Sequence, residues 1–191
     1  FYPDYAFGDS NMINSQTDGI MRNPWGLATD GTWLYVTDQS LRRVQRFKIS
    51  DGSYGGWIGR ISVSPTGGLP GCSGAPVDQA TPGWCTGGYP QYGSDDGELY
   101  HPSGITYAAG NLYVFDSRNG RISAYSATTG AFIGWIGRIS SAPSGGCTTA
   151  HNGDYEVSVS GWCTGGTSTP GERYSDRGGG LTSWDDYRGG I

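Results

Sequence analysis

The sequence predicts an all-β fold, on the strength of three observations. Of its 191 residues, 35 are Gly and 10 are Pro, so about a quarter of the chain consists of residues that interrupt helices. Aromatic residues make up 13% of the chain, which is enough apolar surface for a core with few aliphatic side chains. Charged residues make up only 15%, against roughly 25% in an average domain, and this argues against disorder. The expected protein is aromatic-cored and rich in loops.

An internal repeat with a period of 78 residues organises the chain. Residues 24–62 align without gaps with residues 102–140, and 15 of these 39 positions are identical. The similarity continues further along, because Gly-Trp-Cys-Thr-Gly-Gly occurs at both 83–88 and 161–166. Self-similarity at a fixed period is typical of folds that stack one supersecondary unit.

Each copy of the repeat is expected to form four short strands separated by turns. The expected strands are 26–29, 33–37, 43–49 and 54–58 in the first copy, and 104–107, 112–115, 121–125 and 131–136 in the second. Asp30-Gly31, Asp51-Gly52 and Thr129-Gly130 fall between strands, where glycine supplies the positive φ that tight turns need. Each copy is therefore predicted to be a four-stranded antiparallel meander.

The repeat resembles the blades of the NHL family of β-propellers. The matching features of the first copy are Pro24-x-Gly26-Leu27, Leu34-Tyr35-Val36-x-Asp38, Arg43-Val44, Phe47 and Gly52. Those of the second are Pro102-x-Gly104-Ile105, Leu112-Tyr113-Val114-x-Asp116, Asn119-x-Arg121-Ile122, Tyr125 and Gly130. The resemblance implies that each copy is one blade, with its first strand lining a central channel and its fourth outermost. The chain departs from the family in the roughly 40 residues that separate one blade from the next, since propeller repeats of this kind usually follow at about forty-odd residues.

The repeat divides the chain into five parts. They are an N-terminal arm or partial insert (1–23), a first blade (24–62), a Cys-containing insert (63–101), a second blade (102–140), and a second Cys-containing insert with the start of a third repeat (141–191). The third repeat is expected at Gly190-Ile191, which matches Gly26-Leu27.

Two blades cannot close a propeller ring, which needs about four to eight. We therefore expect a ring or fibre completed by further copies or by a longer parent chain, because each blade alone would leave an apolar face uncovered. The alternative is a self-contained two-blade sandwich whose inserts cover these faces.

The four cysteines are expected to form two local disulfides, Cys72–Cys85 and Cys147–Cys163, since each copy then closes its own insert. A zinc site would need ligand clusters, usually with closer Cys spacing, and the sequence has none. A disulfide across about 15 residues contributes roughly 3 kcal/mol and persists only in an oxidising compartment. The predicted location is extracellular, at the cell surface or periplasmic.

Two acidic features are weighed as possible sites. In NHL repeats the Asp that ends the second strand generally accepts backbone N–H groups from the following loop, so Asp38 and Asp116 are expected to be structural turn residues. The run Asp95-Asp96-Gly97-Glu98 has clustered oxygens of the kind that Ca²⁺ prefers. It lacks the alternating spacing of an EF-hand loop, and a solvated turn is the favoured interpretation.

No catalytic, cofactor-binding or metal-binding residue is predicted. Zinc-dependent lyases of the propeller family use several channel histidines, whereas this chain has only His101 and His151. The sequence also contains no nucleophile elbow or P-loop. The net charge of −5 argues against nucleic-acid binding, and no apolar run approaches the roughly 18 to 20 residues of a membrane-spanning helix.

The expected function is a non-catalytic, extracellular scaffold, an adhesion or assembly module built from repeats. Its expected partners are other copies of itself or further repeats, with a cell-surface protein or glycan as another candidate. Aromatic residues of the inserts are candidate surface-binding positions: Trp84, Tyr89, Tyr92 and Trp162. For the two tryptophans, packing that roots the insert is favoured over ligand stacking. The alternative is part of a propeller enzyme or a lectin-like glycan-binding propeller whose site other blades complete.

Overall fold

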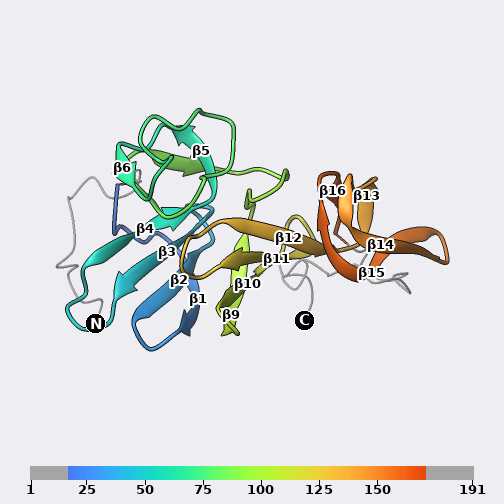
Figure 1. Cartoon of the computed structure of the whole chain (residues 1–191), viewed down its shortest axis with the longest axis horizontal. Helices are drawn as coiled ribbons and strands as arrows, with labels where there is room; N and C mark the ends of the chain where they lie inside the picture. Colours follow the sequence, from blue (N-terminus) through green and yellow to red (C-terminus); the bar gives the residue numbers. More distant parts are fainter. Residues whose placement is uncertain (1–16, 171–191) are drawn as a thin grey trace, which may run out of the picture.

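The computed structural model describes residues 17–170, and these residues form an all-β molecule with antiparallel sheets (Figure 1). The predicted third repeat at Gly190-Ile191 and most of the predicted N-terminal arm lie outside this range. Within the described range no helix has the length and apolar character needed to cross a membrane. The sheets of residues 17–170 remain open and do not join into a closed ring.

The first copy of the repeat, called repeat 1 from here on, forms the predicted meander. Its strands are β1 (Pro24–Thr29), β2 (Trp33–Asp38), β3 (Arg43–Lys48) and β4 (Tyr54–Ile58). Neighbouring strands pair antiparallel throughout. These bounds differ from the predicted ones by at most two residues, so the four-strand prediction is confirmed.

Repeat 2 has the same arrangement. Its strands are β9 (Pro102–Ala108), β10 (Asn111–Asp116), β11 (Arg121–Ser126) and β12 (Phe132–Gly137). The order β9-β10-β11-β12 matches β1-β2-β3-β4, as expected for two copies of one supersecondary unit.

The Cys-containing inserts extend both sheets, which the sequence did not lead us to expect. In repeat 1 the order is β1-β2-β3-β4-β7-β6, with β6 (Gly67–Gly68) and β7 (Cys85–Thr86) added at the edge. In repeat 2, β15 (Tyr155–Thr164) and β14 (Gly145–Asn152) take these places. The ends of each insert also form small two-stranded sheets, which pair β5 (Arg60–Val63) with β8 (Tyr89–Gln91) and β13 (Ile139–Ser141) with β16 (Thr167–Ser168).

The two inserts fold differently because of their residues. The first contains Pro70, Pro76 and Pro82, which cannot donate to a strand ladder, and it folds back on repeat 1 as an irregular loop. Its backbone is fixed there by Ile61 N donating to Gln79 O at 2.8 Å and Thr81 N donating to Gly59 O at 2.9 Å.

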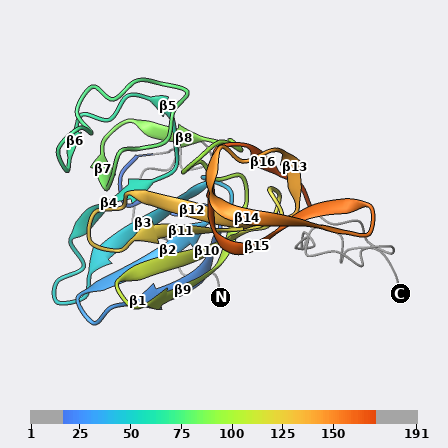
Figure 2. The ribbon, with the colours of Figure 1, turned by 45° about the vertical axis from the view of Figure 1, so that its right-hand side comes forward.

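The second insert forms a long hairpin instead. It has no proline between its cysteines, and the hairpin turns at Gly153, whose φ of 71° suits a two-residue loop. Figures 1 and 2 show this β14–β15 hairpin extending away from the rest of the molecule.

The main core lies between the two repeats. One face of repeat 1 packs against one face of repeat 2, with the insert residue Trp84 and Leu99 among them. The buried members are Tyr35, Val44, Ile58, Trp84, Leu99, Leu112, Val114, Tyr125 and Ala127. Strands β1 and β9 lie side by side at one end of this interface (Figure 2). Gly26 is required there, because a Cβ at this position would collide with the carbonyl oxygen of Ser103.

Candidate functional site

Asp38 and Asp116 hold the segment that precedes each repeat. The carboxylate of Asp38 accepts hydrogen bonds from Arg22 N at 2.7 Å and Asn23 N at 3.2 Å, and a third from Leu41 N at 3.0 Å. Asp116 repeats the pattern, accepting from the backbone N–H groups of residues 100 and 101, both at 3.0 Å. The role is structural, but most of the donors precede the first strand and do not come from the following loop as expected.

A buried arginine reinforces this connection in both repeats. The Nη2 of Arg43 donates to the carbonyl oxygens of Thr17 and Ile20, at 3.0 and 2.8 Å. Its counterpart Arg121 donates in the same way to residues 95 and 98, at 2.9 and 2.8 Å. Both side chains are fully buried. Sequence reasoning matched these arginines to the family without giving them a role, although their identity in the two copies was a signal that each binds the same segment.

The two disulfides join the predicted pairs, Cys72–Cys85 and Cys147–Cys163, with Cα–Cα distances of 5.3 and 4.6 Å. Cys85 and Cys163 lie at equivalent positions, each paired across the sheet with the tryptophan of the fourth strand. Their partners are not equivalent, because Cys147 occupies the position that Leu69 has in repeat 1. Two disulfides are consistent with a secreted or extracellular protein.

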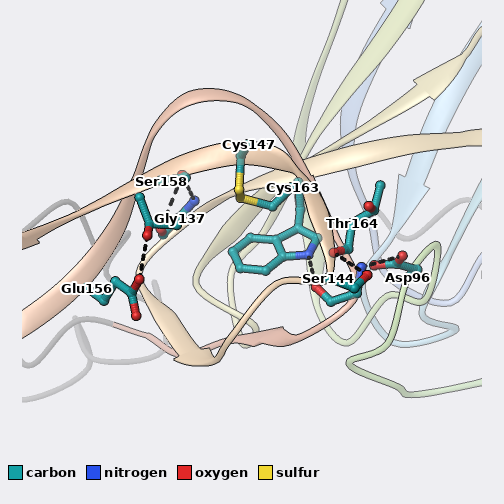
Figure 3. Close-up of a disulfide and its surroundings, with 11 residues drawn as sticks. Asp96, Gly137, Ser144, Cys147, Glu156, Ser158, Cys163 and Thr164 are labelled. Carbon is teal, nitrogen blue, oxygen red and sulfur yellow. Dashed lines mark hydrogen bonds between the residues drawn. A yellow bond between two sulfur atoms is a disulfide. The ribbon is translucent and has the colours of Figure 1, made fainter.

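A second contact closes each insert onto its repeat. Asp18 accepts a hydrogen bond from Gly87 N at 2.8 Å, and Asp96 accepts one from Gly165 N at 2.7 Å. Figure 3 shows Asp96 close to Thr164, at the end of the insert that carries the Cys147–Cys163 disulfide. Asp96 therefore has a structural partner and is not simply a solvated turn residue.

Glu98 also departs from the solvated turn that was expected for residues 95–98. Its side chain is only 2% exposed, and its carboxylate lies 3.5 Å from Arg60 Nε and accepts a hydrogen bond from Asp95 N. Burial raises the pKa of Glu98, although the Asp95 N–H and the Arg60 guanidinium oppose the shift. Glu98 is thus a buried structural acid.

A shallow acidic depression lies beside Glu98. Its lining consists of Asp78, Gln79, Ala80, Asp95, Asp96 and Glu98. Asp78 is paired with Arg60 at 3.1 Å, so two of the four acids share one cation. Among residues 17–170, no three or more His, Cys, Asp or Glu side chains are grouped so that they could hold a metal ion. His101 precedes β9, and His151 lies on β14.

The four candidate surface aromatics have different surroundings. Trp84 is fully buried, and its indole N–H donates to Ala127 O at 2.9 Å. It is therefore not part of a binding surface, and it packs inside the molecule, the interpretation that the sequence favoured. Tyr89 and Tyr92 are exposed, at 40% and 54%. Tyr92 stacks on Tyr100 with ring centroids 4.9 Å apart. Trp162 is partly exposed.

Repeat 2 exposes the face that repeat 1 buries. We call this surface the open face of repeat 2, and it consists of the partly exposed side chains of Tyr113, Phe115, Ile122, Ile136 and Trp162. The equivalent residues of repeat 1 are all fully buried against repeat 2: Tyr35, Thr37, Val44, Ile58 and Trp84. An apolar face of this kind on an otherwise compact protein indicates an interaction surface.

A scan against models of known protein families finds no match to this chain, and a search of curated proteins finds none either. The resemblance to NHL blades thus remains a prediction from the motif residues.

Proposed function

We propose that the chain is a two-blade, NHL-like propeller unit of an extracellular scaffold that assembles with like units. The observation that carries this proposal is the open face of repeat 2. Its five side chains are apolar or aromatic, and their counterparts in repeat 1 are fully buried by a neighbouring repeat. A partly exposed sheet face with this composition is typical of an interaction surface, since sheets usually bury their apolar face against another layer.

The disulfides support an extracellular or cell-surface location. Each closes an insert at the edge of its sheet, with sequence separations of 13 and 16 residues. Such bonds persist outside the reducing cytosol.

The roles of the buried polar residues favour a scaffold over an enzyme. Asp38, Asp116 and Glu98 are all buried, and each carboxylate accepts hydrogen bonds from backbone N–H groups of the same chain. Acids with these partners fix loops in place. The enzyme alternative requires other blades to supply the catalytic groups, and stoichiometric zinc in the purified protein would favour it.

The test is the size and shape of the particle in solution. Sedimentation of the purified, oxidised chain at micromolar concentration should give species heavier than the 20.2 kDa monomer. Electron microscopy of the same sample should show rings or rods. A compact monomer at every concentration, with a single cooperative unfolding transition, would overturn the assembly proposal.

A further inference from the structure

The interface between the two repeats provides a template for a contact between molecules. On the repeat 1 side, Trp84 stacks near Tyr35, with ring centroids 5.7 Å apart and planes inclined by 30°. The turn that follows β11 in repeat 2 docks on this pair. Its backbone accepts hydrogen bonds there: Ala127 O from the indole of Trp84 at 2.9 Å, and Thr129 O from the backbone N of Trp84 at 3.1 Å.

On the open face of repeat 2, an equivalent tryptophan and tyrosine are arranged in the same way as the pair on which the turn docks. Trp162 and Tyr113 are the residues equivalent to Trp84 and Tyr35. Their ring centroids are 5.4 Å apart and their planes are inclined by 28°, which closely matches the buried pair. In contrast with Gly26, a Cβ placed at the equivalent Gly104 would meet only the Cβ of Phe115, at 3.6 Å. The side chains of the open face are partly exposed, whereas their counterparts in repeat 1 are fully buried.

Repeat 1 exposes the surface that would fit this site. We call it the outer face of repeat 1, and its exposed apolar residues are Met21, Trp25, Leu27 and Ile49 at 42%, 55%, 65% and 52%. Their counterparts in repeat 2 lie in the interface: Leu99 and Ser103 at 0%, Ala127 at 2%, and Ile105 packed against the core. Ile49 begins the turn that is equivalent to the docked turn of repeat 2. One chain therefore carries residues equivalent to both halves of the interface, with exposed or partly exposed apolar side chains on each surface.

Three positions at these open surfaces hold larger, more apolar residues than their buried counterparts: Trp25, Ile49 and Phe115. At the internal interface, the hydroxyl of Thr37 donates to Ser103 O at 2.5 Å. The equivalent pair across the proposed contact is Phe115 with Trp25, two aromatic residues. The residue of repeat 1 that is equivalent to the docked Ala127 is the larger Ile49. Aromatic and aliphatic enrichment of this kind is typical of the centre of a protein interface.

We propose that the open face of repeat 2 binds the outer face of repeat 1 of a second copy of this chain. The contact repeats the internal interface, with the Ile49 turn of the incoming copy seated on Trp162 and Tyr113. It is heterologous, because the two surfaces differ, and such contacts build rings or filaments. This inference rests on the proposed assembly function and specifies the surfaces that would perform it.

Charged substitutions on the two surfaces test the proposal. Ile49→Asp alters an exposed turn of the outer face, and Trp162→Asp alters the open face. Each should raise the dissociation constant of self-association more than tenfold, measured by sedimentation and light scattering. Val159→Asp is the matched control, because Val159 is 58% exposed on β15 but belongs to neither surface. Circular dichroism confirms folding, and Ile49→Asp remains informative if Trp162→Asp does not fold.

Mixing the two variants gives the sharper result. The Ile49→Asp chain keeps an intact open face, and the Trp162→Asp chain keeps an intact outer face. Neither should assemble alone, and an equimolar mixture should form a dimer and nothing larger. If wild-type protein assembles and Ile49→Asp assembles equally well, the proposed surfaces are wrong and the scaffold function stands. If wild-type protein stays monomeric, the scaffold function falls together with this inference.

Discussion

Trp84 and Trp162 occupy equivalent positions in the two repeats but have different surroundings. Trp84 is fully buried, with the guanidinium of Arg46 4.7 Å from its ring centroid and Tyr35 stacked nearby. Trp162 stacks on Tyr113 and stays partly exposed. The energetic contribution of the same residue in the same local sequence should therefore differ between the repeats.

Alanine substitution measures this difference. Trp84→Ala should lower the free energy of unfolding by about 3–5 kcal/mol, because it leaves a cavity between the repeats and removes the hydrogen bond to Ala127. Trp162→Ala, its matched control, should cost less than half as much in monomeric protein. Urea unfolding at low protein concentration checks both values, and equal losses would contradict the assigned environments.

Trp84 and Trp162 show which features of the site can be predicted from the sequence and which cannot. The identical Gly-Trp-Cys-Thr-Gly-Gly segments correctly predict equivalent backbone positions and equivalent cysteines. They cannot predict that one indole is covered and the other is not, because burial depends on which repeat has a neighbour on that side. Glu98 was misjudged for a similar reason, since its partner Arg60 is distant in the sequence.

The elements of the two inserts depend on local residue choice. Pro70, Pro76 and Pro82 interrupt residues 69–84 of the first insert, which form no strand, whereas the second insert alternates β-formers around Gly153 and pairs along its length. The four-stranded meanders were predictable from turn residues and periodicity. The added strands β6 and β7 were not, because each has only two residues, and their place depends on β7 pairing with β4 of the meander and β6 pairing with β7.

Removing each disulfide should distinguish the inserts. Replacing both cysteines of either pair by Ala should cost roughly 3 kcal/mol or less of global stability, since the closed loops are of similar length. The local effects should differ. Hydrogen exchange in residues 69–84 should speed up when Cys72 and Cys85 are lost, because few ladder bonds hold that loop.

The β14–β15 hairpin provides the comparison. Its amides should remain protected without Cys147 and Cys163, because the strands pair from Gly145 to Tyr155 independently of the disulfide. Loss of protection along the whole hairpin would show that the disulfide, and not the strand ladder, maintains its register.

At the scale of the whole molecule, assembly should couple stability to protein concentration. Association that involves only folded chains stabilises the native state by mass action, so the midpoint of thermal unfolding should rise as the concentration increases. Tryptophan fluorescence during heating, over a hundredfold range of protein concentration, measures this midpoint. The Ile49→Asp variant should show a midpoint that does not change with concentration. A constant midpoint for the wild-type chain would mean that its open face needs no partner.

Gly68 and Cys85 have the same spacing in sequence as Gly146 and Cys163, yet the intervals between them fold as an irregular loop in one case and a hairpin in the other. Two meanders with the same strand order thus carry different conformations at the same edge. The interval is a position where the protein can acquire new surface chemistry while its architecture is preserved, and foreign peptides of equal length are natural candidates for grafting there.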